Sequence, residues 1–301
     1  MPDSINRREF AAGTAGLAGS LFAPMAARGQ GRVRRHGGTH LKLSLNAFSF
    51  NRPLRDATMS LDDVVDFCAA HGFAGLDATG YYFPGYPEVP EDRYVHALKR
   101  KAYVNGITIH RTGVRNDFAV ADPESRRRDV QLVKAWIKVA AKLGAGVIRI
   151  FSGRQAPDGF SFGQVLEWMA RDIRECADCG REHGVIVGLQ HHHDFLKTAA
   201  ETIRVVEAVN SEWFGVVLDV GSLRQEDPYA EIERLLPYAV GWQLKENVWF
   251  GDRETPVDLK RVKQIIDRAG FRGFLTIETL GDGDPRAKVA RFLDEVRAVF
   301  G

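Results

Sequence analysis

Four stretches of the chain each end in side chains that could bind a ligand or move a proton. Each stretch is a short apolar run that ends in a polar residue. Side chains on a strand point alternately to its two sides, so this polar residue shares one face of the strand with small or apolar residues that precede it. Where such strands run parallel, their C-terminal ends meet at one edge, where parallel α/β proteins carry their active sites. We therefore expect one site assembled from four strand ends. Its candidate residues are Gln190 and His192, Asp219, Gln243 and Lys245, and Glu278.

The elements that must position this site alternate strictly between strand and helix. The helix starts carry clear signals, such as Ser60 before one helix and Asp122 followed by Pro123 before another. Eight strand–helix pairs predict a single closed (β/α)8 TIM barrel, with an open doubly wound sheet as the alternative. No glycine-rich phosphate fingerprint follows the first strand to favour that alternative. The predicted strands cover residues 43–48, 72–77, 107–110, 147–151, 184–190, 214–219, 240–245 and 274–278.

Composition narrows the classes of function. The formal net charge of the 301 residues is only +2, so neither a nucleic-acid-binding nor a membrane-binding surface is indicated. The three cysteines do not make a disulfide framework. Cys176 and Cys179 have the spacing of a redox motif, but they fall inside a helical pattern rather than at a helix start. We interpret them as core residues rather than as a redox or metal pair.

The first 40 residues differ from the rest of the chain. Arg7 and Arg8 precede a weakly apolar run over residues 11–23, and small residues follow at a plausible cleavage region. This arrangement resembles a twin-arginine export signal, with a disordered basic tail as the alternative. We expect residues 1–40 to be a signal peptide and flexible linker, and residues 41–301 to be the folded domain. The mature protein would be periplasmic or secreted, without stable insertion into a membrane.

The folded part of the chain resembles the xylose isomerase-like barrels, the sugar phosphate isomerase/epimerase family. The most specific likeness lies in three motifs, Gly215–Gly221, Gln243–Glu246 and Gly273–Glu278. In that family the last four strands end in Glu, Asp, His and Glu, which bind one divalent cation, and the two glutamates also move protons. The resemblance places these roles at Gln190, Asp219, Gln243 and Glu278.

Two of these four positions depart from the family pattern. Gln190 replaces a glutamate, and Gln243 replaces a histidine. An amide oxygen can still ligate a hard cation, so a metal site with Asp219 and Glu278 stays open, and an all-oxygen set favours Mn²⁺, Mg²⁺ or Ca²⁺ over Zn²⁺. Buried, hydrogen-bonded amides would explain the two glutamines equally well. The two carboxylates could also be ordinary ion-pair partners of Lys245.

A proton-transfer reaction at this site needs a base. Gln190 cannot accept a proton, which leaves Glu278 as the first candidate base. His192 shares the phase of Gln190 and is the second candidate base, or a fifth metal ligand. Lys245 could polarise a substrate oxygen or neutralise a neighbouring carboxylate. The two flanking histidines are expected to be loop residues, His191 and His193.

Other strands direct polar side chains to the same end of the barrel. Arg149 could hold a carboxylate, a phosphate or a sugar hydroxyl, or act as the counter-ion of Asp219. Two expected loops, at residues 81–86 and 247–250, are rich in aromatic residues. Their rings could stack on a sugar, or pack together as a lid or a dimer contact, which leaves a homo-oligomer open. The expected substrate-binding residues are Asn46, Asp77, His110, Arg149 and Trp249.

The leading hypothesis is an exported, metal-dependent isomerase- or epimerase-like enzyme that acts on a sugar or keto-sugar. It would remove the proton beside a carbonyl bound to one divalent cation, a chemistry that includes elimination from 3-keto-glycosides. One alternative is a carbohydrate-binding protein of the same fold whose catalysis is lost at Gln190. A second is an AP-endonuclease-like DNA repair enzyme, which export and a near-neutral charge disfavour. The expected partner is a small carbohydrate rather than nucleic acid.

Overall fold

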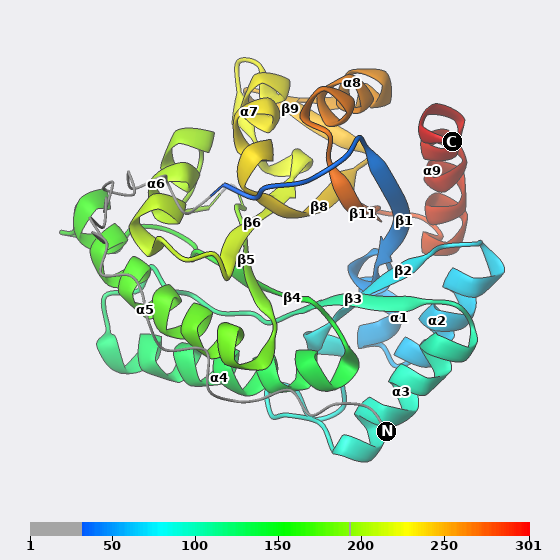
Figure 1. Cartoon of the computed structure of the whole chain (residues 1–301), viewed down its shortest axis with the longest axis horizontal. Helices are drawn as coiled ribbons and strands as arrows, with labels where there is room; N and C mark the ends of the chain where they lie inside the picture. The colour runs from blue at the N-terminus through cyan, green and yellow to red at the C-terminus, as the bar shows by residue number, and fades with distance from the viewer. Residues whose placement is uncertain (1–31, 193) are drawn as a thin grey trace, which may run out of the picture.

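Eight parallel strands close into a barrel in the computed structural model of the chain, which describes residues 32–192 and 194–301 (Figure 1). The strands follow one another around the barrel in chain order, and the last pairs with the first. This closure confirms the predicted single (β/α)8 TIM barrel and excludes the open sheet, which would have two unpaired edges. The barrel strands are β1 (His40–Asn46), β2 (Gly75–Thr79), β3 (Thr108–Gly113), β4 (Val147–Phe151), β5 (Ile186–Gln190), β6 (Phe214–Asp219), β8 (Ala239–Lys245) and β11 (Arg272–Glu278).

Local signals in the sequence set where the helices outside the barrel begin and end. Before α2 (Leu61–Ala70), Ser60 and Asp63 form a reciprocal capping box that satisfies free backbone N–H groups. The long helix α4 (Pro123–Leu143) ends where Gly144 adopts a left-handed conformation. The other helices are α1 (Asn51–Arg55), α3 (Asp92–Val104), α5 (Phe162–His183), α6 (Ala199–Val209), α7 (Pro228–Leu235), α8 (Leu259–Ala269) and α9 (Pro285–Phe300).

The hydrophobic core fills the layer between the strands and the helices. Every residue of β2 and of β6 is buried, as expected for strands that are covered on both faces. The apolar faces of the helices supply the other side of this layer. Cys176 and Cys179 are free cysteines buried in α5, which agrees with their interpretation as core residues. Among the helices that the structure describes, none is both long and apolar enough to cross a membrane.

An arginine crosses the interior of the barrel beneath the candidate site. Arg111 on β3 is 1% exposed, and its Nη2 donates to the Gln243 side-chain oxygen (2.9 Å) and to the Trp242 carbonyl (3.1 Å) on β8. Gly241 leaves room for it, because a Cβ there would lie 2.7 Å from the arginine Nη1. The Nε of the same guanidinium donates to Asp77 Oδ2 on β2 (2.7 Å). This crossing ties β2, β3 and β8 together and fixes the orientation of the Gln243 amide.

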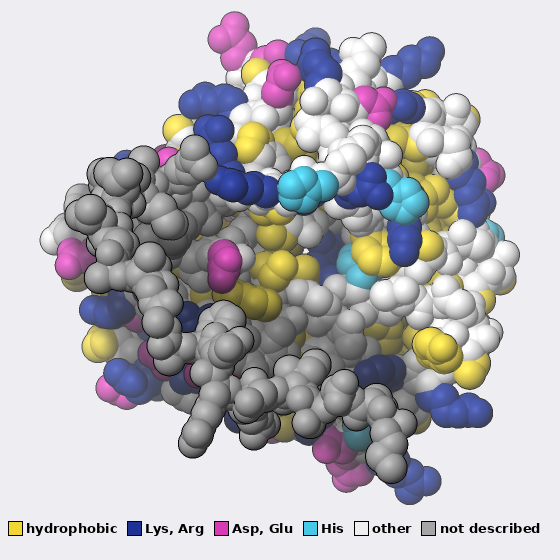
Figure 2. Space-filling model, in the orientation of Figure 1, with side chains coloured by type: hydrophobic (Ala, Val, Ile, Leu, Met, Phe, Trp, Pro, Cys, Tyr) yellow, Lys and Arg dark blue, Asp and Glu magenta, His cyan; other side chains and the backbone are white. Residues whose placement is uncertain are grey.

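The segment before β1 packs against the N-terminal end of the barrel. The Val33 N–H donates to the Pro237 carbonyl (2.8 Å), and Arg35 Nη2 donates to the Ala239 carbonyl (2.6 Å). Figure 2 shows Lys, Arg and His side chains gathered along the path that this segment follows in Figure 1. The flexible linker expected up to residue 40 is therefore held against the barrel from Val33 onward. The predicted export signal at Arg7 and Arg8 lies outside the described residues.

A small three-stranded sheet continues from the C-terminal ends of β6 and β8. It consists of β7 (Arg224–Gln225), β9 (Asn247–Phe250) and β10 (Arg253–Pro256), with β9 in the centre. The sequence interpretation of residues 247–250 as a loop was wrong, because these residues pair on both sides as a strand. The sheet therefore gives Trp249 a fixed backbone rather than a loop position.

Candidate functional site

The ends of β5, β6 and β8 meet around one buried carboxylate. Asp219 is fully buried, and its Oδ2 accepts hydrogen bonds from Gln190 Nε2 (2.7 Å), Ser222 Oγ (2.8 Å) and Lys245 Nζ (2.9 Å). Its Oδ1 accepts the Gly221 backbone N–H (3.1 Å). Burial alone would raise the pKa of Asp219, but the ammonium of Lys245 and the other donors lower it to about 2. Asp219 is therefore a fixed anion that orients its neighbours.

A second carboxylate, Glu278 at the end of β11, lies on the other side of the same ammonium group. Lys245 Nζ is 3.5 Å from Glu278 Oε1, and Gln243 Nε2 donates to Glu278 Oε2. Burial is the largest influence and raises the pKa of Glu278 above its ordinary value, although the charge of Lys245 lowers it. Of the two carboxylates, Glu278 is thus the one more readily protonated.

Lys245 carries the positive charge between these two carboxylates. Burial would lower its pKa, but the attraction of Asp219 and Glu278 raises that pKa above the ordinary value of 10.5. The group is therefore a permanent cation at neutral pH. An ammonium group has three N–H donors, and the two carboxylates account for two of them. One donor is left for a ligand in the adjoining cavity.

The side chains at the four strand ends meet as predicted, but their contacts do not fit a divalent cation. Gln243 turns its nitrogen toward Glu278 because Arg111 holds its oxygen, and Gln190 likewise presents its nitrogen to Asp219. A hard cation needs several oxygens that converge on one point. Here N–H donors and an ammonium group take up the carboxylate oxygens. Within the described residues, no group of three His, Cys, Asp or Glu side chains could hold a metal ion.

Three consecutive histidines occupy positions 191–193, and the structure describes two of them, His191 and His192. His191 directly follows the end of β5 and belongs to no strand or helix, as expected of a loop residue. It is nevertheless only 1% exposed, and its Nε2 accepts the Asp219 backbone N–H (3.1 Å). Burial lowers its pKa to about 4, which keeps the ring neutral and able to accept. The half-exposed His192 lines the cavities at the barrel mouth and has its Nδ1 3.0 Å from Asp194 Oδ2. His192 is therefore exposed to both cavities, and its role as second base stays a prediction.

Two cavities open at the C-terminal end of the barrel and share His192, Lys245 and Glu278. The substrate cavity, as we call the first, has a volume of about 310 Å³ and is also lined by Asn46, Arg149 and Gln190. The second has a volume of about 420 Å³ and is lined by Trp249, over whose ring the guanidinium of Arg224 lies at 4.0 Å. The structure thus brings most of the predicted residues together. Tyr81, from the aromatic stretch 81–86 that could stack on a sugar, also lines this cavity, whereas Arg115 was not among the predicted site residues.

Asp77 has a structural environment rather than a substrate-binding one. It is 2% exposed, pairs with Arg111, accepts Asn46 Nδ2 (3.3 Å), and lines none of the cavities at the mouth. The sequence gave no signal for Arg111 as its partner. The pairing of β2 with β3 shifts so that Ile109 and Arg111 face consecutive residues of β2, which aligns Arg111 with Asp77. Such an irregularity cannot be read from the alternation of side chains.

His110, also expected to bind substrate, lies far from the mouth. Its ring stacks on Phe274 with 4.1 Å between centroids, and both rings adjoin Gly75 at the start of β2. This places His110 near the N-terminal ends of the strands. The same register shift explains the difference, because it gives the interior position near the mouth to Arg111.

Replacing Asp77 with Ala should lower the free energy of unfolding by about 3–5 kcal/mol, because a buried guanidinium would lose its counter-ion. Urea denaturation measures this loss. Asp56→Ala is the matched control, since Asp56 pairs with Arg52 on the surface and should cost less than about 1 kcal/mol. A stable Asp77→Ala variant that only binds ligand less well would restore Asp77 to the substrate site.

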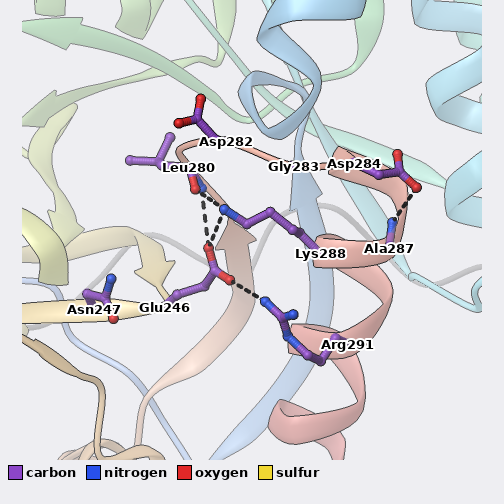
Figure 3. A pocket seen from close by; sticks show the side chains of 9 residues that line it. All are labelled: Glu246, Asn247, Leu280, Asp282, Gly283, Asp284, Ala287, Lys288 and Arg291. Carbon is purple, nitrogen blue, oxygen red and sulfur yellow. Dashed lines mark hydrogen bonds and ion pairs between the residues drawn. The ribbon is translucent and has the colours of Figure 1, made fainter.

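A third cavity, of about 480 Å³, lies beside the mouth between β9 and α9 (Figure 3). Three of its charged groups pair with one another: Glu246 pairs with Lys288 (3.5 Å) and with Arg291 (3.4 Å), and Lys288 also donates to the Leu280 carbonyl. Figure 3 shows these side chains pointing toward one another. The two basic side chains of this cavity are therefore already paired with Glu246.

Comparisons with known proteins agree with this architecture. The family model described as Xylose isomerase-like TIM barrel matches residues 65–296. No curated protein matches the sequence. Among solved structures, D-psicose 3-epimerase from Clostridium cellulolyticum H10, with D-tagatose, is 17% identical with a TM-score of 0.73, covering 86% of this chain and 99% of that chain.

Two further structures show the range of proteins with this fold. The IolI protein with a binding zinc atom is 15% identical with a TM-score of 0.70, covering 86% of this chain and 99% of that chain. The probable 3-DHS dehydratase AsbF from Bacillus anthracis is 18% identical with a TM-score of 0.66, covering 85% and 98%. At these identities the likeness establishes the fold and leaves the reaction to be argued from the site.

Proposed function

Because the chain belongs to the xylose isomerase-like TIM barrel family, we propose that it is an enzyme that removes a proton beside the carbonyl of a sugar or keto-sugar. The product would be an isomer, an epimer or, for a 3-keto-glycoside, an elimination product. The observation that carries this proposal is the buried pair of Glu278 and Lys245 at one wall of the substrate cavity. It sets a base beside a fixed positive charge, the two groups that such a reaction needs.

Glu278 is the proposed base. Burial raises its pKa, which makes its carboxylate a stronger base than that of an exposed glutamate, while the charge of Lys245 favours the ionised form. The carboxylate would take the proton from the carbon next to the carbonyl. His192 lines the same cavity and would return a proton at the neighbouring atom, or serve as the base if the sugar lies the other way. Gln190 has no part in the proton transfer, because an amide is not a base at neutral pH.

Lys245 is proposed to stabilise the oxygen on which negative charge develops. Its third N–H is not used by Asp219 or Glu278 and is available for the carbonyl oxygen of the substrate. In this role the ammonium supplies the charge that the family resemblance had assigned to a divalent cation. Asp219 holds the ammonium in position, which makes Asp219 a positioning residue.

Three structural neighbours support the substrate and reaction classes. One is a D-psicose 3-epimerase with D-tagatose, another is a D-psicose 3-epimerase in the presence of D-fructose, and a third is a probable dehydratase. Epimerisation of a ketose and dehydration of a keto compound can both begin with loss of an α-proton. The proposal is tested by incubating the protein in D₂O with aldoses, ketoses and 3-keto-glycosides. Deuterium beside the carbonyl, detected by NMR, is the expected result.

A carbohydrate-binding protein without catalysis is the second candidate. The observation that favours it is the pair of amides, Gln190 and Gln243, at positions where the resemblance expects a glutamate and a histidine. Binding of a sugar with neither exchange nor elimination in any member of the panel would support this candidate over the enzyme.

We further propose that the protein is exported through its twin-arginine segment. Changing Arg7 and Arg8 together to Lys should leave the full-length protein in the cytoplasm, because this route depends on the paired arginines. Cell fractionation followed by immunoblotting measures the distribution. Changing Arg32 and Arg34 to Lys is the matched control and should not alter delivery. Normal periplasmic delivery of the Arg7/Arg8 variant would refute the assignment.

A further inference from the structure

One buried arginine of the described chain differs from the others in having no carboxylate partner. The buried arginines are Arg111, Arg126 and Arg149. Arg111 pairs with Asp77 at 2.7 Å, and Arg126 pairs with Asp172 at 2.9 Å. Arg149 is only 4% exposed, yet no carboxylate of the described residues lies within ion-pair distance of it. Burying a guanidinium without a counter-charge is costly, so this exception calls for an explanation.

The guanidinium of Arg149 is held rigidly at the wall of the substrate cavity. Its Nη1 donates to the Val114 carbonyl (2.6 Å), and its Nη2 donates to the Tyr81 hydroxyl. The rings of Tyr81 and Phe151 lie 5.3 Å and 4.2 Å from its central carbon. Gly113 is needed beside it, since a Cβ there would lie 2.8 Å from that carbon. The guanidinium of Arg149 is thus held in a fixed position, but its hydrogen-bond partners are all neutral.

The other charges around the cavity do not balance Arg149. Arg115 and Arg154 also line the cavity, and the central guanidinium carbon of Arg115 lies 4.8 Å from the centre of the Tyr81 ring. None of the ion pairs among the described residues involves either of them. Two carboxylates also line the cavity, but Glu278 is paired with Lys245, and Asp194 lies 3.0 Å from His192 Nδ1. The cavity therefore has an excess of positive charge on the side of Arg149.

We infer that the substrate carries an anionic group, a carboxylate or a phosphate, which binds to Arg149 with Arg115 beside it. This inference rests on the proposed function and names the substrate class of the same site. Guanidinium groups bind the paired oxygens of such anions with short, directed hydrogen bonds, and the low exposure of Arg149 strengthens the attraction. The anion would occupy one side of the cavity and leave the carbonyl end of the sugar to Lys245 and Glu278. For an exported enzyme, an acidic sugar is the expected source of the carboxylate.

Binding of matched sugar pairs tests this inference. Each pair has one acidic member and its uncharged parent: hexuronates with hexoses, aldonates with alditols, and sugar phosphates with the free sugars. Isothermal titration calorimetry at low salt should show at least one acid, or one phosphate, that binds at least about 10-fold more tightly than its parent. Which kind of acid is preferred separates a carboxylate from a phosphate. If every acid binds no more tightly than its parent, the anionic subsite is refuted.

Variants connect the preference to Arg149. Arg149→Met keeps the length of the side chain and removes the charge, so the acid should lose its advantage over the parent sugar. Arg149→Lys should retain part of it, because the charge stays but the paired donors do not. Arg291→Met is the matched control, since Arg291 pairs with Glu246 in the neighbouring cavity of Figure 3. An unchanged preference in Arg149→Met, with a native circular dichroism spectrum, would refute the assignment.

The outcome also separates this inference from the proposed reaction. If the protein prefers an acid and this preference depends on Arg149, but no substrate exchanges deuterium, the anion subsite is supported and the proposed reaction is refuted. If only uncharged sugars exchange deuterium and no acid is preferred, the proposed reaction is supported and the anion subsite is refuted.

Discussion

Glu278→Gln should abolish incorporation of deuterium beside the carbonyl while leaving the barrel folded. The amide has nearly the shape of the carboxylate but cannot accept the α-proton, so we expect a loss of about 10²–10⁴-fold, the usual contribution of general base catalysis. NMR of the sugar after incubation in D₂O measures the rate. Glu231→Gln is the matched control, because Glu231 is also a buried glutamate but lies on α7, outside the mouth. Unchanged exchange in Glu278→Gln would transfer the role of base to His192.

The pH dependence of the same rate follows from the pKa of Glu278. Because burial raises this pKa above 4.5, the carboxylate form is lost as the pH falls through a value higher than that of an exposed glutamate. The exchange rate should therefore rise with pH through that raised pKa and then reach a plateau. Lys245 stays protonated along the plateau, because its own pKa is raised above 10.5. A rate that is constant down to pH 4.5 would contradict the assignment of the base.

Lys245→Met should lower the exchange rate by about 10²–10³-fold, because the substrate oxygen would lose its charged donor. Methionine has a similar length and no charge, so the change tests the charge rather than the volume. Added Mn²⁺, Mg²⁺ or Zn²⁺ should not restore the rate of this variant. Recovery with one of these ions would show that the metal, and not the ammonium, is the electrophile.

The loss of Lys245 also leaves Asp219 with less compensation for its charge, so folding of the variant must be checked separately. Circular dichroism and thermal unfolding serve this purpose. Lys288→Met provides the matched control, since Lys288 also pairs with a carboxylate, Glu246, but lies in the cavity of Figure 3. We expect Lys288→Met to keep the wild-type exchange rate. Lys245→Arg should keep the charge and the fold but lose rate, because a planar guanidinium cannot place a single donor in the same position.

The fold could be predicted from the sequence because its signals are local. The periodicity of the strand at residues 214–219 and the start of the helix at Pro123 depend on neighbouring residues alone, and the structure places both elements at these residues. Eight such units leave few arrangements other than a closed barrel. The small sheet around β9 was missed, because its two-residue partner strand β7 carries no periodic signal.

The site could be predicted only in part, because strand phase gives the direction of a side chain but not its partner. Asp219 and Glu278 are at the mouth as expected, yet which atoms face them depends on Arg111, which fixes the Gln243 amide from across the barrel. The irregular pairing of β2 with β3 brings Arg111 there and leaves His110 at the other end. A contact of this kind joins residues distant in the sequence, and no local pattern reveals it.

Deuterium exchange by metal-depleted wild-type protein tests the central claim most directly, that Lys245 and Glu278 remove the α-proton without a divalent cation. The protein is treated with chelator, its metal content is checked by elemental analysis, and it is incubated in D₂O with the most active sugar of the panel. We predict the same exchange rate before and after depletion. Elemental analysis should find fewer than roughly one bound metal ion per ten chains in the depleted protein. Loss of exchange on depletion, with recovery on adding one equivalent of Mn²⁺ or Zn²⁺, would contradict it.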